Sequence, residues 1–181
     1  HAMFLRQSLL LFLAQAFLLG FGVLNNLLVA YLGGPEGKGS IYLVQLISGV
    51  GLISLNLGLG PASVFYLGNH SRYTPQEIAT SVLSPSLLAG MLPLAILVPN
   101  WPWVRPFLSE KLSGLHLWVA LAAIPALTLT WNTSHLFLGN GDMRRFNLLR
   151  VLPAALFFVF MLLLLLVESS SVVSMVVLWL V

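Results

Sequence analysis

Long apolar stretches separated by short polar segments dominate this chain. A hydrocarbon core of about 30 Å needs about 20 apolar residues in helical form. Five stretches reach that length, and a sixth, at about 1.5 Å per residue, reaches only half-way across. The predicted spans cover residues 8–32, 41–67, 77–98, 115–138 and 146–167, with the shortened sixth at residues 172–181. The pattern therefore predicts an all-α, polytopic transmembrane helix bundle of five full spans plus a truncated sixth.

The short last stretch, residues 172–181, also predicts how long the whole protein is. A helix that stopped at Val181 would leave carbonyl groups inside lipid, where they find no hydrogen-bond partner. We therefore expect the chain to be a piece of a longer protein, and an interfacial anchor is the alternative. Residues 1–3 are interpreted as a cloning remnant and the start, which leaves residues 4–181 as one transmembrane unit.

The composition agrees with a membrane protein. Hydrophobic residues make up 59% of the chain and charged residues 7%, whereas a soluble domain carries about 25% charged residues. The charged side chains fall almost entirely between the predicted spans. The chain contains no cysteine, which excludes disulfide bonds and thiol chemistry.

The distribution of charge predicts an orientation. Loops on one side of the predicted bundle carry more basic residues than loops on the other side. The richer side has Arg6, Arg72, Arg144, Arg145 and Arg150, and the poorer side has Lys38, Arg105 and Lys111. Because basic loops stay on the cytoplasmic side, we expect a cytoplasmic N-terminus and insertion into the inner (cytoplasmic) membrane.

Two of the polar connections carry local signals. Thr74 precedes Pro75 and lies three residues before Glu77, an arrangement that predicts an N-terminal capping box for the third span. Residues 100–114 contain two tryptophans among charged residues. This composition predicts a short amphipathic piece at the membrane interface, with an ordinary loop as the alternative.

Polar side chains within the spans are the candidates for substrate contact. They are Gln15, Asn25, Asn26, Gln45, Asn56, Asn132 and His135. The predicted lining of a substrate cavity consists of Asn25, Asn26, Gln45, Asn56 and His135. Asn25 and Asn26 point about 100° apart on a helix, so we expect at most one to face a given groove.

Each of these side chains also has a structural alternative. Amides in membrane bundles often bond helix to helix, a contact that contributes about 0.6 kcal/mol on average. His135 has two readings, a proton relay or a histidine bonded to the backbone near the interface.

Arg144, Arg145 and Arg150 form a basic cluster near the loop between the predicted spans 115–138 and 146–167, which we expect on the cytoplasmic side. Guanidinium groups match the geometry of phosphate, so one reading is capture of a phosphate-bearing lipid at the cytoplasmic mouth. The other reading is a role in topology and in attraction to anionic lipids.

Several function classes lose support. No span interior carries a charged residue, which counts against ion-coupled drug antiport. The sequence lacks a nucleophile-elbow serine, a two-histidine metal helix and a phosphate-binding glycine loop. We therefore expect no enzymatic activity, no catalytic residue, no metal, no cofactor and no nucleic-acid partner.

Three glycine-containing regions resemble a known family. They are Leu32-Gly33-Gly34-Pro35-Glu36-Gly37-Lys38-Gly39 with Tyr42, Asn56-Leu57-Gly58-Leu59-Gly60-Pro61-Ala62 with Tyr66-Leu67-Gly68, and Leu138-Gly139-Asn140-Gly141 with Arg144-Arg145-Phe146-Asn147. In these regions the chain resembles polysaccharide-biosynthesis, O-antigen-type flippases of the multidrug/oligosaccharidyl-lipid/polysaccharide exporter superfamily. The resemblance implies that the chain is the N-terminal lobe of a two-lobe transporter.

The resemblance also implies a mechanism and partners. It implies alternating access about a central cavity and movement of a lipid-linked oligosaccharide or polysaccharide precursor. The implied partners are the lipid bilayer, the lipid-linked glycan, and a C-terminal lobe or a second copy of the chain. Two alternatives stay open, an exporter of drugs or other small molecules in the same superfamily and a non-transporting membrane scaffold.

Replacing Arg144→Ala together with Arg145→Ala tests the two readings of the basic cluster. If the guanidinium groups capture phosphate, we expect glycan export to fall further than the amount of membrane-inserted protein. Export from cells and immunoblots of membranes measure the two quantities. An equal loss of both would leave a role in folding or topology only.

Overall fold

The described part of the chain is helical and contains no strand. The computed structural model describes residues 2–68, 73–100, 103 and 114–166. The helices are α1 (Ala2–Leu55), α2 (Leu59–Gly68), α3 (Pro75–Leu97), α5 (Gly114–Gly139) and α6 (Met143–Leu166). The predicted all-α class is confirmed.

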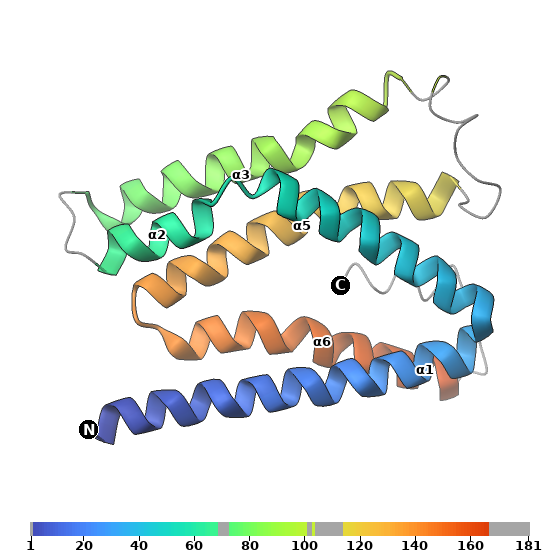
Figure 1. Cartoon of the computed structure of the whole chain (residues 1–181), viewed down its shortest axis with the longest axis horizontal. Coiled ribbons are helices and arrows are strands. Elements are labelled where there is room, and N and C mark those ends of the chain that lie inside the picture. Colours follow the sequence, from blue (N-terminus) through green and yellow to red (C-terminus); the bar gives the residue numbers. More distant parts are fainter. Residues whose placement is uncertain (1, 69–72, 101–102, 104–113, 167–181) are drawn as a thin grey trace.

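A sharp bend divides α1. Gly34 has φ 59° and ψ −164°, and Pro35 follows it. Glycine adopts this positive φ without the clash that a Cβ would cause, and proline suits the first turn of the helix that follows. Figure 1 shows the chain turning back here, so α1 has a first limb (residues 2–33) and a second limb (residues 35–55).

The second predicted span, residues 41–67, is not one continuous helix. The second limb ends at Leu55, and α2 begins at Leu59. Between them Leu57 has φ 50° and Gly58 has φ 70°. Left-handed residues cannot continue a right-handed helix, so the hydrogen-bond ladder stops and restarts. Apolarity persists across the break, which is why the hydrophobic pattern predicts a single span.

The helices are long and apolar enough for membrane insertion, but five separate spans are not confirmed. Four helical stretches meet the length and hydropathy of a span, namely Ser8–Leu55, Pro75–Leu97, Gly114–Gly139 and Met143–Leu166. The first of them contains both limbs of α1. The sixth predicted span, residues 172–181, lies outside the described residues, as does most of the predicted interfacial segment 100–114.

The remaining predicted boundaries agree closely with the helices. The spans at residues 77–98, 115–138 and 146–167 correspond to α3, α5 and α6 within a few residues. The capping box is also confirmed. Thr74 Oγ1 accepts from the Glu77 backbone N–H at 3.3 Å, and Glu77 Oε2 accepts from the Thr74 backbone N–H at 2.7 Å. These reciprocal bonds satisfy donors that the first turn of α3 would otherwise leave open.

Helix α5 lies at the centre of the bundle (Figure 1). Three clusters of buried side chains hold the bundle together, and α5 contributes to each of them. One joins α5 to both limbs of α1 and to α6, one joins it to α2 and α3, and one joins it to the second limb and α3. The outer helices are therefore assembled around α5.

Large apolar side chains cover much of the outer surface. Phe12, Ile53, Leu88 and Leu166 are each more than two-thirds exposed, and they lie on the two limbs of α1, on α3 and on α6. A soluble protein rarely exposes contiguous apolar surface on this scale, whereas lipid tails solvate it. The exposed faces therefore indicate a protein that resides in a membrane.

Gly90→Ala tests how closely α3 approaches α5. A Cβ on Gly90 would lie 2.7 Å from the Cα of Pro125, a backbone atom that cannot move aside alone. We expect the free energy of unfolding to fall by about 1–3 kcal/mol because the two helices must separate. Denaturation of the purified chain in mixed micelles measures it.

Gly49→Ala is the matched control for this experiment. Gly49 is also helical, and a Cβ there would meet nothing within 4 Å. Equal stabilities of the Gly90→Ala and Gly49→Ala variants would contradict the close approach of α3 to α5.

Candidate functional site

A polar cleft lies between the two limbs of α1 and helix α6. It encloses about 270 Å³ and is partly open. The second limb contributes Lys38, Tyr42 and Gln45, which share one helix face because their spacing of four and three residues matches a helical turn. The other lining residues are Gly22, Asn25, Asn26, Val29, Ile41, Leu127, Pro153, Ala154 and Phe157. The cleft thus combines polar and cationic side chains inside an otherwise apolar bundle.

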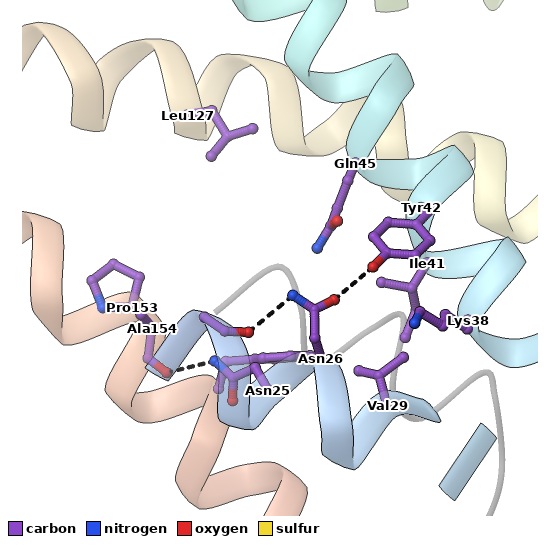
Figure 2. A pocket seen from close by; sticks show the side chains of 12 residues that line it. Asn25, Asn26, Val29, Lys38, Ile41, Tyr42, Gln45, Leu127, Pro153 and Ala154 are labelled. Carbon is purple, nitrogen blue, oxygen red and sulfur yellow. Dashed lines mark hydrogen bonds between the residues drawn. The ribbon is translucent and has the colours of Figure 1, made fainter. Parts of the chain in front are cut away.

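Asn26 connects the two limbs across the cleft. Its Oδ1 accepts a hydrogen bond of 2.7 Å from the hydroxyl of Tyr42, and its Nδ2 donates to the Gly22 carbonyl at 2.9 Å (Figure 2). The side chain is exposed to the cleft and not sealed within the core. The Asn26–Tyr42 hydrogen bond orients both side chains, and both remain exposed.

Asn25 faces the opposite wall of the same cleft. Its Nδ2 donates to the Ala154 carbonyl of α6 at 3.1 Å (Figure 2). Its Oδ1 is buried and has no hydrogen-bond partner among the described residues. The expectation that at most one of the two asparagines faces the groove is therefore wrong. The cleft reaches from α6 to the second limb, so side chains about 100° apart meet different walls of it.

Lys38 and Gln45 complete the polar lining. The Lys38 ammonium lies 5.6 Å from the centre of the Tyr42 ring, within cation–π range. The Gln45 side chain points into the cleft (Figure 2). Sequence reasoning included Gln45 but placed Lys38 in an outer loop and overlooked Tyr42 as a lining residue. The available signal was the helical spacing of these three residues after Pro35.

Asn132 and His135 lie on α5, away from this cleft. Asn132 is fully buried, and its Nδ2 donates to Ser86 Oγ of α3 at 2.7 Å. His135 Nδ1 lies 2.8 Å from the Trp131 carbonyl, one turn earlier on the same helix. Both contacts match the structural alternatives, a helix-to-helix bond for Asn132 and a backbone bond for His135. The structure does not bring His135 to the cleft.

Asn56 and Gln15 also lie apart from the cleft lining. Asn56 stands at the helix break, where its backbone N–H still bonds to the Leu52 carbonyl at 3.0 Å. Its Oδ1 is buried and has no hydrogen-bond partner within the described ranges. Gln15 is exposed on the first limb. Of the five predicted cavity residues, the structure therefore brings Asn25, Asn26 and Gln45 together.

The basic cluster lies at the turn between α5 and α6. Figure 1 shows this turn at the opposite end of the bundle from the bend of α1. Arg145 Nε lies 3.3 Å from Asp142 Oδ2, and the Arg145 guanidinium also lies over the Phe137 ring. The Arg150 guanidinium lies over the Phe146 ring in the same way. All three arginines are exposed, so their guanidinium edges can reach lipid headgroups or solutes.

Comparisons with protein-family models, with curated proteins and with solved structures find no match to this chain. The resemblance to saccharide flippases therefore remains a hypothesis that rests on the glycine-containing segments.

A double-mutant cycle on Asn26→Ala and Tyr42→Phe tests the bond across the cleft. We expect a coupling free energy of about 0.5–1 kcal/mol, because each single change already removes the same hydrogen bond. Unfolding of the four proteins in mixed micelles measures it. Tyr31→Phe in place of Tyr42→Phe is the control, since Tyr31 is 78% exposed. Coupling of Asn26 to Tyr31 as strong as its coupling to Tyr42 would contradict the bond.

Proposed function

We propose that this chain is part of a membrane transporter that moves a lipid-linked oligosaccharide or polysaccharide precursor across the inner membrane. The observation that carries the proposal is the cleft of Asn25, Asn26, Lys38, Tyr42 and Gln45 within an apolar bundle. A membrane protein tolerates such groups at depth mainly where they serve a polar solute or pair with each other. Here Asn26 and Tyr42 pair with each other, and both side chains stay exposed, so a solute in the cleft can reach them.

The side chains of the cleft match the chemistry of a glycan linked to phosphate. Amide groups both donate and accept, as sugar hydroxyls do, and the Tyr42 hydroxyl extends this set. The Lys38 ammonium is a point charge suited to phosphate. The apolar outer faces of the neighbouring helices suit the lipid chain. A lipid-linked saccharide requires both kinds of surface at once.

The charge of the cleft favours this substrate over a cationic drug. Among the described residues that line the cleft, Lys38 is the one charged residue and none is acidic. A site for an organic cation would need the opposite sign. This argument supports a saccharide flippase over the drug exporter of the same superfamily.

The backbone contains two breaks that can act as hinges during alternating access. The bend at Gly34 and the break at Leu57 and Gly58 divide the first part of the chain into three stiff helical pieces. Movements between stiff elements are absorbed at a few such residues. In the proposed mechanism a second lobe or a second copy closes the open side of the cleft. The exposed arginines at the α5–α6 turn lie on the cytoplasmic side, together with the N-terminus.

Gln45→Leu is the sharpest test of the proposed cleft. Removing one hydrogen-bonding group that contacts the glycan should lower the rate of flipping about fivefold to tenfold. The assay is the translocation of a fluorescent lipid-linked oligosaccharide in proteoliposomes that hold equal amounts of folded protein.

Gln15→Leu is the matched control, because it makes the same chemical change on the exposed surface of the first limb. We expect this variant to flip at the rate of the unaltered protein. Equal rates for Gln45→Leu and the unaltered protein, or equal losses in both variants, would reject the cleft as the glycan path.

A further inference from the structure

A second cavity lies between α2 and α3, and none of its described lining residues belongs to the cleft. It encloses about 490 Å³. Its lining divides into an aromatic pair, a carboxylate and an apolar floor. The lining residues are Leu59, Ala62, Ser63, Tyr66, Tyr73, Glu77, Ile78, Ser81 and Val82.

Two tyrosines form a corner in this cavity. The ring centres of Tyr66 and Tyr73 are 6.4 Å apart, and the ring planes meet at 79°. Phe65 makes a second edge-to-face contact with Tyr66, with ring centres 5.5 Å apart. Ring faces carry negative potential, so two rings set near a right angle can both contact one cation. Tyr66 and Tyr73 are 47% and 62% exposed, so neither side chain is sealed in the core.

Glu77 supplies a negative charge in the same lining. The capping box holds the carboxylate in place, because Oε2 accepts from both the backbone N–H and the hydroxyl of Thr74. Oε1 takes no hydrogen bond from the described part of the chain. One carboxylate oxygen is thus anchored while the other can accept from a ligand.

The floor of the cavity is apolar. Ile78 and Val82 belong to the buried cluster between α2, α3 and α5, and Leu59 packs against that cluster. The nearby hydroxyls of Ser63 and Ser81 donate to carbonyls of their own helices, at 2.6 Å and 3.0 Å. Their donors are therefore engaged, and the floor offers apolar surface to an alkyl chain.

We propose that this cavity binds an alkylammonium group, a positively charged amine that carries an apolar chain. The aromatic corner and the Glu77 carboxylate hold the cation, and the floor holds the chain. The same chemistry occurs in the amine headgroups of phospholipids and in free amphipathic amines. The inference is independent of the proposed transport of glycans, since it uses none of the residues of the cleft.

Binding of hexylammonium, a primary amine that is protonated at neutral pH, to the full chain in dodecyl maltoside tests the proposal. Equilibrium dialysis with the radiolabelled cation, corrected for micelles without protein, gives the bound amount. We expect saturable binding of the cation and no saturable binding of hexylsulfonate, which has the same chain and the opposite charge. Equal binding of the two compounds would overturn the proposal, because the cavity would then recognise only the alkyl chain.

Two sets of variants locate the site. Glu77→Gln removes the charge but keeps the capping box, since glutamine serves equally at that position of the motif. We expect it to weaken binding at least about fivefold. Tyr66→Leu with Tyr73→Leu should weaken binding about tenfold or more, whereas Tyr66→Phe with Tyr73→Phe keeps the ring faces and should retain most of it. Tyr31→Leu, on the exposed first limb, is the control.

Wild-type affinity in both the Glu77→Gln and the leucine variants would overturn the proposal. Competition then identifies the source of the ligand. Displacement of the probe by phosphatidylethanolamine, but not by phosphatidylglycerol, would support a lipid headgroup. A site that retains the probe in the presence of both lipids would support a free amphipathic amine.

Discussion

The close approach of the other helices to α5 is the constraint on which the bundle depends. In lipid the hydrophobic effect does not drive helices together, so packing and hydrogen bonds between helices must do so. Gly51 and Gly90 provide the required space, because a Cβ on either would collide with Ile124 or Pro125 of α5. Ser48 adds a hydrogen bond of 3.0 Å to the Ala120 carbonyl. The second limb of α1 and α3 are thus fixed to the same two turns of α5.

The cleft follows from this arrangement. The bend at Gly34 returns the second limb to α5 while the first limb packs along α6, and the two limbs enclose a space between them. Val29, Ile41 and Phe157 belong to the buried cluster at the base of that space and also line it. The polar side chains therefore stand above an apolar floor, and their hydrogen bonds join elements that the core already holds in place.

The hydrophobic pattern could predict α3, α5 and α6, since each is a single apolar segment with polar residues at its ends. It could not predict the break in the second span, because hydropathy does not depend on φ. The glycine-containing regions that carry the family resemblance hold the glycines with positive φ, at Gly34, Gly58 and Gly141. Those glycines have a backbone role in this chain, so each of the three regions has a conformational reason for its glycine.

Composition alone also could not separate the amides that build the fold from those that line the cleft. Asn132 and Asn26 are the same residue type in apolar helices, yet one is fully buried against Ser86 and the other is exposed beside Tyr42. The difference arises from which helix face each occupies relative to α5, and this is a tertiary property. Gln45 and Lys38 line the same site because the second limb is helical from Pro35 onward, which places both residues on one helix face.

The cleft and the second cavity carry lining charges of opposite sign. They lie on different helices and are therefore separate sites. Among the described lining residues, Lys38 is the charged group in the cleft beside α6, and Glu77 is the charged group in the cavity between α2 and α3. Helix α5 packs against both regions through buried apolar side chains. The two proposed ligands, which have opposite charges, would therefore contact different side chains. A substitution in one cavity should leave the other intact, because the described lining residues of the two cavities are all different.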